Sequence, residues 1–168
     1  DGLQVGTTFL SASRECSITG APINFEVVKL STRPTALHIA GLLSIDECRA
    51  LMAAADKQGP MMAATAAGGT EKHGCGVAYV PIEDCATSQS LAATCEQLLL
   101  TPEAQEPSGW GSGGHFEDLQ VLRYEKGGEF ALHYDADQQK NRVLSVLLYL
   151  NGEGQTWFPL ATAATTAP

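Results

Sequence analysis

The chain has 168 residues, of which 44% are hydrophobic and 17% are charged, values typical of one globular domain rather than of a disordered chain. Its 19 acidic residues outnumber its 10 basic residues, so the formal net charge at pH 7 is −9, and nucleic acid is not an expected partner. No apolar run approaches the roughly 18 residues of a membrane-spanning helix, so we expect no membrane-spanning segment.

The first half of the sequence predicts strands and then a helix. Two short strands are expected at residues 25–30 and 36–40, on either side of residues 32–34. Ser44 is followed three residues later by Glu47, which is the spacing of a capping box. Apolar residues then recur at helical spacing, so we expect a helix to begin at this point.

Further elements follow in the same half. The first helix is expected to end before Pro60, because proline does not continue a helix. Residues 61–69 are small, rich in Ala and Gly and without a period, which predicts a mobile loop. A strand is expected at residues 77–82, and a second amphipathic helix is introduced by Ser88 and closed at Pro102.

The second half of the sequence changes to the pattern of strands. Strands are expected at residues 119–124, 130–134 and 143–150, with a turn at residues 127–128 and a hairpin turn at residues 151–152. Because helices come first and strands afterwards, the chain predicts an α+β fold. Its helices are expected on one face of a largely antiparallel sheet or barrel.

The expected strand at residues 143–150 has two different faces. Its even positions are all apolar, whereas its odd positions include the hydroxyls of Ser145 and Tyr149. One face is therefore expected to pack and the other to line a polar ligand inside a barrel. The alternative is that the Tyr149 hydroxyl only bonds a backbone group.

The five cysteines are an odd number and show no C-x-x-C spacing, so at least one is expected to remain unpaired in a monomer. Cys48 and Cys95 lie in helical patterns, where we expect buried thiols. Cys16, Cys75 and Cys85 remain as candidates for a disulfide.

One of the four histidines stands out because a carboxylate lies two residues after it. In an extended chain His133 and Asp135 point to the same side, and together they fill two corners of the facial triad that binds non-haem Fe(II). His38 lies in an apolar strand and is expected to be a hydrogen-bonded core residue. His73 and His115 lie in Gly-rich segments and are expected to be solvated.

A long segment around this pair resembles a known family. Residues 117–159, EDLQVLRYEKGGEFALHYDADQQKNRVLSVLLYLNGEGQTWFP, resemble the catalytic core of prolyl 4-hydroxylases, within the Fe(II)- and 2-oxoglutarate-dependent oxygenases. Residues 36–55, ALHIAGLLSIDECRALMAAA, resemble that family's leading segment and first long helix.

The resemblance implies one oxygenase domain over residues 1–168. Residues 1–116 would supply supporting strands and helices, residues 117–159 the catalytic core, and residues 160–168 a low-complexity tail or the start of a loop. The implied core is a double-stranded β-helix, the cupin-like jelly-roll, with the N-terminal helices packed on its major sheet.

The family's functional positions can be carried over one by one, and the implied roles concern iron, cosubstrate and substrate. The iron ligands are His133 and Asp135, the positions beside 2-oxoglutarate are Tyr124, Tyr149 and Thr156, and the positions at the substrate mouth are Glu117 and Arg142. For Arg142 the alternative is a solvated charge at the end of a strand.

The implied activity is hydroxylation of a prolyl residue in a peptide or protein, with release of succinate and CO2. It uses Fe(II), 2-oxoglutarate and O2, with ascorbate as reductant. Phe130 stands where peptide hydroxylases often have Tyr, Gln155 stands where the family usually has Glu, and residues 136–141 form a short connection. A 2-oxoglutarate oxygenase with a non-prolyl substrate therefore remains an alternative.

Two family features have no counterpart in the sequence: the third ligand, a histidine, and the basic residue that pairs with the distal carboxylate of 2-oxoglutarate. We expect both to lie beyond Pro168, with the C-terminal part of the barrel. The alternatives are a catalytically inactive module that binds a proline-rich partner, and a cupin-like metal-binding barrel of unrelated chemistry. The secretory pathway (endoplasmic reticulum) and the cytoplasm are both open as locations.

Overall fold

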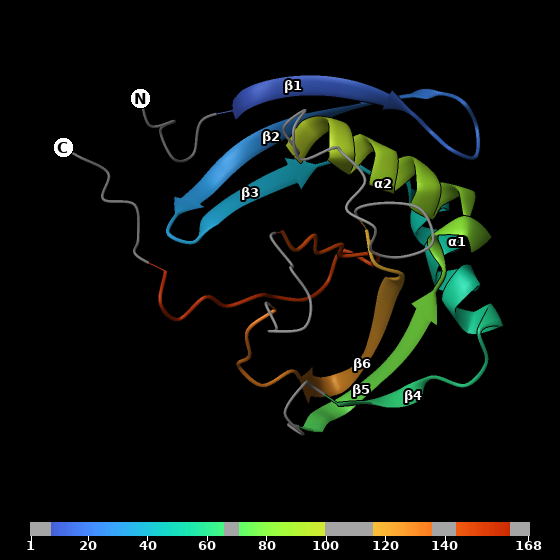
Figure 1. The fold of residues 1–168 in the computed structure, drawn as a ribbon, viewed down its shortest axis with the longest axis vertical. Helices are drawn as coiled ribbons and strands as arrows, with labels where there is room; N and C mark the ends of the chain where they lie inside the picture. The colour runs from blue at the N-terminus through green and yellow to red at the C-terminus, as the bar shows by residue number, and fades with distance from the viewer. Residues whose placement is uncertain (1–7, 66–70, 100–115, 136–143, 162–168) are drawn as a thin grey trace. The chain divides into compact units, whose positions relative to one another are not determined.

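The computed structural model describes residues 8–65, 71–99, 116–135 and 144–161. The chain divides into two compact units, Asp1–Cys48 with Asn151–Pro168, and Arg49–Leu150. The described residues form two three-stranded antiparallel sheets and two α-helices (Figure 1). The predicted α+β class is confirmed, and the jelly-roll core stays a prediction.

The sheet of the first unit has the strand order β1-β2-β3, with β1 at Thr8–Glu15, β2 at Pro22–Thr32 and β3 at Thr35–Ala40. The two strands predicted in this region are confirmed within β2 and β3. Phe25 and Val27 alternate along β2 and are only 4% and 2% exposed, so one face of the strand packs.

β1 was not predicted from the sequence. Its partly buried positions are Ala12 and Arg14 rather than large apolar residues, and it is held by antiparallel pairing along β2. The core position expected for His38 is wrong, because this residue of β3 is exposed.

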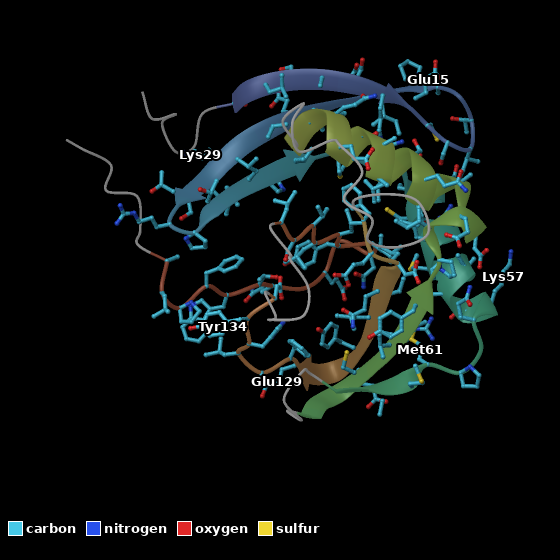
Figure 2. The ribbon with its side chains drawn as sticks, viewed as in Figure 1. Glu15, Lys29, Lys57, Met61, Glu129 and Tyr134 are labelled. Atoms are coloured by element: carbon cyan, nitrogen blue, oxygen red, sulfur yellow. The ribbon has the colours of Figure 1, made fainter. Side chains whose placement is uncertain are left out.

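The sheet of the second unit has the order β4-β5-β6, with β4 at Met62–Thr65, β5 at Glu71–Val80 and β6 at Leu119–Glu129. Its apolar core is a cluster on β5, β6 and helix α1, against which Met61 packs (Figure 2). The buried members are Ala54, Ala55, Ala78, Val80 and Val121.

Both predicted helices are present. Helix α1 spans Ile45–Lys57 and ends before Gly59, whose φ of 98° favours glycine. A short 3-10 helix, η1, spans Ile82–Asp84, and helix α2 spans Ala86–Leu99. Neither helix, nor any other within the described residues, is long and apolar enough to cross a membrane.

The predicted start of the second helix at Ser88 is wrong. Helix α2 begins two residues earlier, and its first backbone bond runs from the amide of Gln89 to the carbonyl of Cys85. Cys85, with extended backbone angles, is therefore the N-cap residue, and Ser88 lies inside the first turn.

The loop expected at residues 61–69 is wrong for residues 62–65, which form β4. β4 pairs with β5 through Met62 opposite Val77 and Ala63 opposite Gly76. Small residues give no alternation of apolar side chains, so the sequence does not predict this strand. It forms because its backbone pairs with β5. Residues 66–69 lie outside the described residues.

The turn expected at residues 127–128 is also wrong, because both glycines lie inside β6. A Cβ atom on Gly128 would stand 2.5 Å from the carbonyl oxygen of Gly74 on β5. The glycines therefore serve the close approach of two backbones where the register of β5 and β6 is irregular, rather than a reversal of the chain.

The strands expected at residues 130–134 and 143–150 are wrong wherever the structure describes them, because residues 130–135 and 144–149 have no strand pairing. Leu144 is 46% exposed and Leu147 is 57% exposed, whereas Leu150 at the end of the segment packs against the core of the second unit. Alternation predicts which face of a strand would be apolar, but a strand also needs a hydrogen-bonded neighbour. The expected reversal at residues 151–152 is present as a turn.

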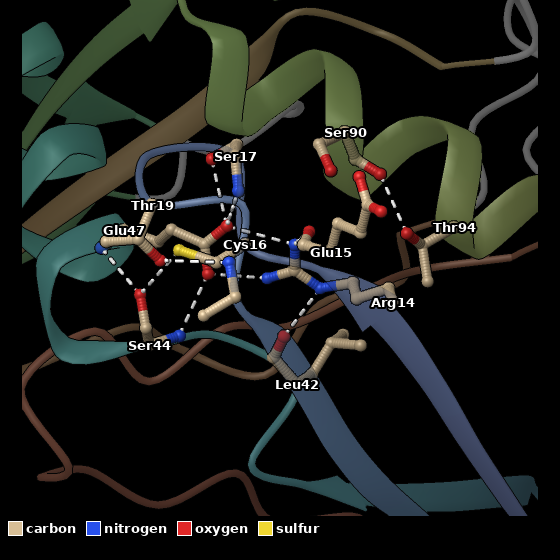
Figure 3. A network of polar contacts seen from close by, with 11 residues as sticks. Arg14, Glu15, Cys16, Ser17, Thr19, Leu42, Ser44, Glu47, Ser90 and Thr94 are labelled. Atoms are coloured by element: carbon tan, nitrogen blue, oxygen red, sulfur yellow. Dashed lines mark hydrogen bonds and ion pairs between the residues drawn. The ribbon is translucent and has the colours of Figure 1, made fainter.

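The start of α1 is fixed by the most buried ionic group in the described residues, the carboxylate of Glu47 (Figure 3). The backbone amide of Ser44 donates to Glu47 Oε2 at 2.9 Å, and the amide of Glu47 donates to Ser44 Oγ at 3.2 Å. This reciprocal pair is the predicted capping box, which is confirmed.

Two further residues complete this network. Arg14 on β1 contacts the same carboxylate through two nitrogens, at 2.9 and 2.6 Å, and its Nε donates to the carbonyl of Leu42 at 2.8 Å. The amide and the hydroxyl of Ser17 also donate to Glu47 Oε1. Burial opposes ionisation of Glu47, but the donors from Arg14, Ser44 and Ser17 outweigh it and lower its pKa to about 2.

The five cysteines all lie within the described residues, and none forms a disulfide. The disulfide considered among Cys16, Cys75 and Cys85 is therefore wrong for this structure. Cys95 is buried, as predicted, whereas Cys48 is partly exposed.

Candidate functional site

The pair predicted to bind iron lies directly after β6. His133 Nε2 is 3.2 Å from Asp135 Oδ1, and the two side chains are 37% and 48% exposed. Tyr134, between them in sequence, is 85% exposed (Figure 2). The ring of Phe130 contacts the imidazole edge-on, with centroids 3.8 Å apart, and so restricts its orientation. The structure thus brings His133 and Asp135 together although their segment is not a strand.

The contact of His133 Nδ1 with a backbone carbonyl determines which of the two ring nitrogens carries the proton in the neutral ring. Nδ1 is 2.9 Å from the carbonyl oxygen of Ala131, and a carbonyl can only accept, so we assign the proton to Nδ1. In the neutral ring Nε2 then carries a lone pair that faces the Asp135 carboxylate. Two acceptors this close need a positive centre between them, either a proton on Nε2 or a metal ion.

The arrangement fits two cis ligands of a metal ion. Two ligand atoms at right angles about a metal, each about 2.1 Å from it, are about 3.0 Å apart. The observed separation of 3.2 Å is close to this value. A backbone carbonyl that accepts from the other ring N–H is the usual support of a metal-binding histidine. Within the described ranges no group of three metal-ligating side chains occurs, so two ligands are what these ranges supply.

The two tyrosines predicted to lie beside 2-oxoglutarate influence one another. Tyr124 on β6 is 43% exposed and Tyr149 is 50% exposed. Burial raises the pKa of Tyr124 to about 12, and Cys75 and the charge of Tyr149 add to the increase. Tyr124, like a tyrosine of ordinary pKa, is a neutral phenol in the physiological pH range.

Cys75 is the member of this cluster that sequence reasoning missed as a site residue. It lies directly opposite Tyr124 in the pairing of β5 with β6 and is 6% exposed. A hydrogen bond between the two side chains contributes to the raised pKa of Tyr124. The signal that finds Cys75 is the register of the two strands, which no local pattern in the sequence reveals.

Three further residues were predicted for the site, one beside the cosubstrate and two at the substrate mouth. Glu117 is exposed and comes just before β6, and Thr156 is exposed and belongs to the first compact unit. Arg142 lies outside the described residues. The contacts that can be described therefore form two groups, His133 with Asp135, and Tyr124 with Tyr149 and Cys75.

The site's chemistry is that of a carboxylate and an imidazole able to share a cation, together with neutral phenol donors. In comparisons with protein-family models, curated proteins and solved structures, no match to this chain was found.

Proposed function

We propose that this chain carries the core of an Fe(II)- and 2-oxoglutarate-dependent dioxygenase of jelly-roll fold that hydroxylates a prolyl residue in a peptide or protein. The observation that carries the proposal is the 3.2 Å approach of His133 Nε2 to Asp135 Oδ1. These are the two residues that the resemblance to prolyl 4-hydroxylases assigns to iron, and the geometry suits cis ligands.

His133 and Asp135 would hold the metal. When bound, iron would supply the activation of O2 for hydroxylation of a C–H bond, coupled to oxidation of 2-oxoglutarate to succinate and CO2. The carbonyl of Ala131 keeps the imidazole in the tautomer whose Nε2 can bind a metal. The Asp135 carboxylate offsets one of the metal's two charges, and the facial triad needs one further protein ligand.

The tyrosines would bind the cosubstrate. A neutral phenol donates a hydrogen bond to a carboxylate, whereas a phenolate would repel it.

Replacing Tyr124 with phenylalanine is expected to raise the KM for 2-oxoglutarate roughly ten-fold or more, with a smaller change in kcat. The reason is the loss of one hydrogen bond to a charged group, worth about 1.5–3 kcal/mol. Steady-state kinetics measure both constants. Tyr79→Phe is the matched control, a tyrosine 49% exposed on neighbouring β5 whose hydroxyl contacts Gln120. An equal effect of both substitutions would contradict the role given to Tyr124.

The substrate class is tested with a proline-rich peptide. Such a peptide holds a preformed polyproline II conformation, which lowers the entropic cost of binding. Incubation with Fe(II), 2-oxoglutarate and O2 is expected to add one oxygen to a prolyl residue and to form succinate, as measured by mass spectrometry. Turnover of a non-peptide substrate alone would overturn the prolyl assignment. Peptide binding that needs no iron and gives no product would favour the inactive binding module.

A further inference from the structure

A chemically reactive position lies outside the candidate iron site, in the turn that follows Tyr149. Asn151 is followed there by Gly152, and both residues are exposed. Gly152 has a φ of 73°, in the left-handed region that favours glycine. A Cβ atom on Gly152 would meet no described heavy atom within 4 Å, so the described residues leave its main chain unshielded.

The side chain of Asn151 is folded back along its own main chain. The backbone amide of Glu153 donates to Asn151 Oδ1 at 3.3 Å, which is the bond of an Asx-turn. This bond closes a ring that contains both the side-chain amide carbon of Asn151 and the backbone nitrogen of Gly152. The same donor would stabilise the negative charge that develops on Oδ1 if the nitrogen attacked the carbon.

Comparison of the asparagines singles out Asn151. The sequence has three, and Asn141 lies outside the described residues. Asn24 lies inside β2, where it pairs with Ser13 of β1. The residue after it is Phe25, which is only 4% exposed and belongs to the packed face. Strand pairing and a packed neighbour therefore both oppose the main-chain movement that an attack on the Asn24 side chain requires.

We propose that Asn151 is a site of spontaneous deamidation, in which the backbone nitrogen of Gly152 attacks the side-chain amide carbon of Asn151. A C–N bond forms to give a cyclic succinimide. The proton of the Gly152 nitrogen passes by way of solvent to the departing amide group, which leaves as ammonia. Water then adds to one of the two succinimide carbonyl carbons and breaks its bond to nitrogen. The product is aspartate or isoaspartate, and no oxidant or reductant takes part.

Either product changes the chain. Aspartate adds one negative charge to the net charge of −9. Isoaspartate adds the same charge and also lengthens the main chain by one carbon, because the chain then runs through the former side chain. This lengthening falls where the sequence passes from the second compact unit, which ends at Leu150, back to the first.

The test incubates the full chain at neutral pH and physiological temperature in water labelled with heavy oxygen, followed by peptide mass spectrometry. Label at Asn151 is expected to accumulate at least about ten-fold faster than at Asn24, the internal control, because glycine puts no side chain in the way. Isoaspartate is expected together with aspartate, since water reaches both carbonyl carbons of the succinimide. Circular dichroism checks that the chain stays folded.

A synthetic peptide of residues 147–156 provides the reference without the fold. Asn151 of the folded chain is expected to react at a rate within about ten-fold of this peptide, or faster, because the turn already places the reacting groups in one ring. A folded chain that reacts more slowly than this limit would overturn the proposal, because the turn would then protect Asn151. Labelling of Asn24 as fast as Asn151, or aspartate as the sole product, would overturn it as well.

Discussion

Replacing His133 with alanine is expected to abolish binding of Fe(II) and to lower prolyl hydroxylation by at least about 100-fold. The imidazole supplies one of the two ligand atoms, and loss even of a group that only supports a ligand costs about 10–100-fold in affinity or activity. Asp135→Ala is expected to have the same effect. Calorimetric titration of the protein with Fe(II) under anaerobic conditions measures the binding.

The control for this prediction is His38→Ala, because His38 is an exposed imidazole on β3, outside the candidate site. It is expected to leave both iron binding and hydroxylation unchanged. Iron binding that survives in both His133→Ala and Asp135→Ala would show that the 3.2 Å pair is a solvent-exposed hydrogen-bonded pair and not a metal site.

Replacing Glu47 with glutamine is expected to lower the free energy of unfolding by about 3–5 kcal/mol. The substitution leaves the Arg14 guanidinium, whose side chain is 6% exposed, without its anionic partner in a buried position. Urea-induced unfolding measures the change. Ser44→Ala, which removes only the cap hydroxyl, is expected to cost about 1 kcal/mol.

A second ion pair, which is exposed, serves as the control for the effect of burial on the Arg14–Glu47 pair. Arg123 Nη2 lies 2.7 Å from Asp56 Oδ1, but these side chains are 60% and 58% exposed. Asp56→Asn is therefore expected to cost less than about 1 kcal/mol, because water and ions screen the exposed pair. Equal losses in Asp56→Asn and Glu47→Gln would contradict the importance given to the buried network.

The same carboxylate predicts a dependence of stability on pH. The pKa of Glu47 is about 2 in the folded chain, below its ordinary value of 4.5. A lowered pKa stabilises the fold above pH 4.5, and this contribution is lost as the pH falls toward 2. The difference in unfolding free energy between the unaltered protein and Glu47→Gln is therefore expected to shrink over this interval.

The capping box shows which features of the fold could be predicted. Ser44 and Glu47 are three residues apart, so their bond lies within one turn and the local sequence displays it. The contact of Arg14 with Glu47 joins residues 33 apart. No local pattern records it, because it depends on how β1 and the start of α1 come together in space.

The strands show what the alternation of apolar side chains can and cannot predict. Phe25 and Val27 alternate with exposed neighbours, and their strand was predicted. β4 shows no such alternation, yet its backbone pairs with β5. Residues 144–149 alternate well but form no strand. Side-chain alternation reports a buried face, whereas strand formation depends on pairing with another segment.

The candidate site also contains residues that are close in sequence, which could be predicted, and residues that only the pairing of strands brings together, which could not. His133 and Asp135 are two residues apart, and their spacing together with the family resemblance predicts the pair, although the strand expected to carry it is absent. The pairing of Cys75 with Tyr124 joins two strands and could be recognised only from their register. Arg142, predicted at the substrate mouth, lies outside the described residues.

The most direct test of the central claim is the visible absorption spectrum of the protein with Fe(II) and 2-oxoglutarate in the absence of O2. A 2-oxo acid chelated to protein-bound Fe(II) gives a charge-transfer band that neither component gives alone. We expect this band in the unaltered protein, a weaker response at low 2-oxoglutarate concentration in Tyr124→Phe, and no band in His133→Ala. Absence of the band from the unaltered protein, or its persistence in His133→Ala, would contradict the account.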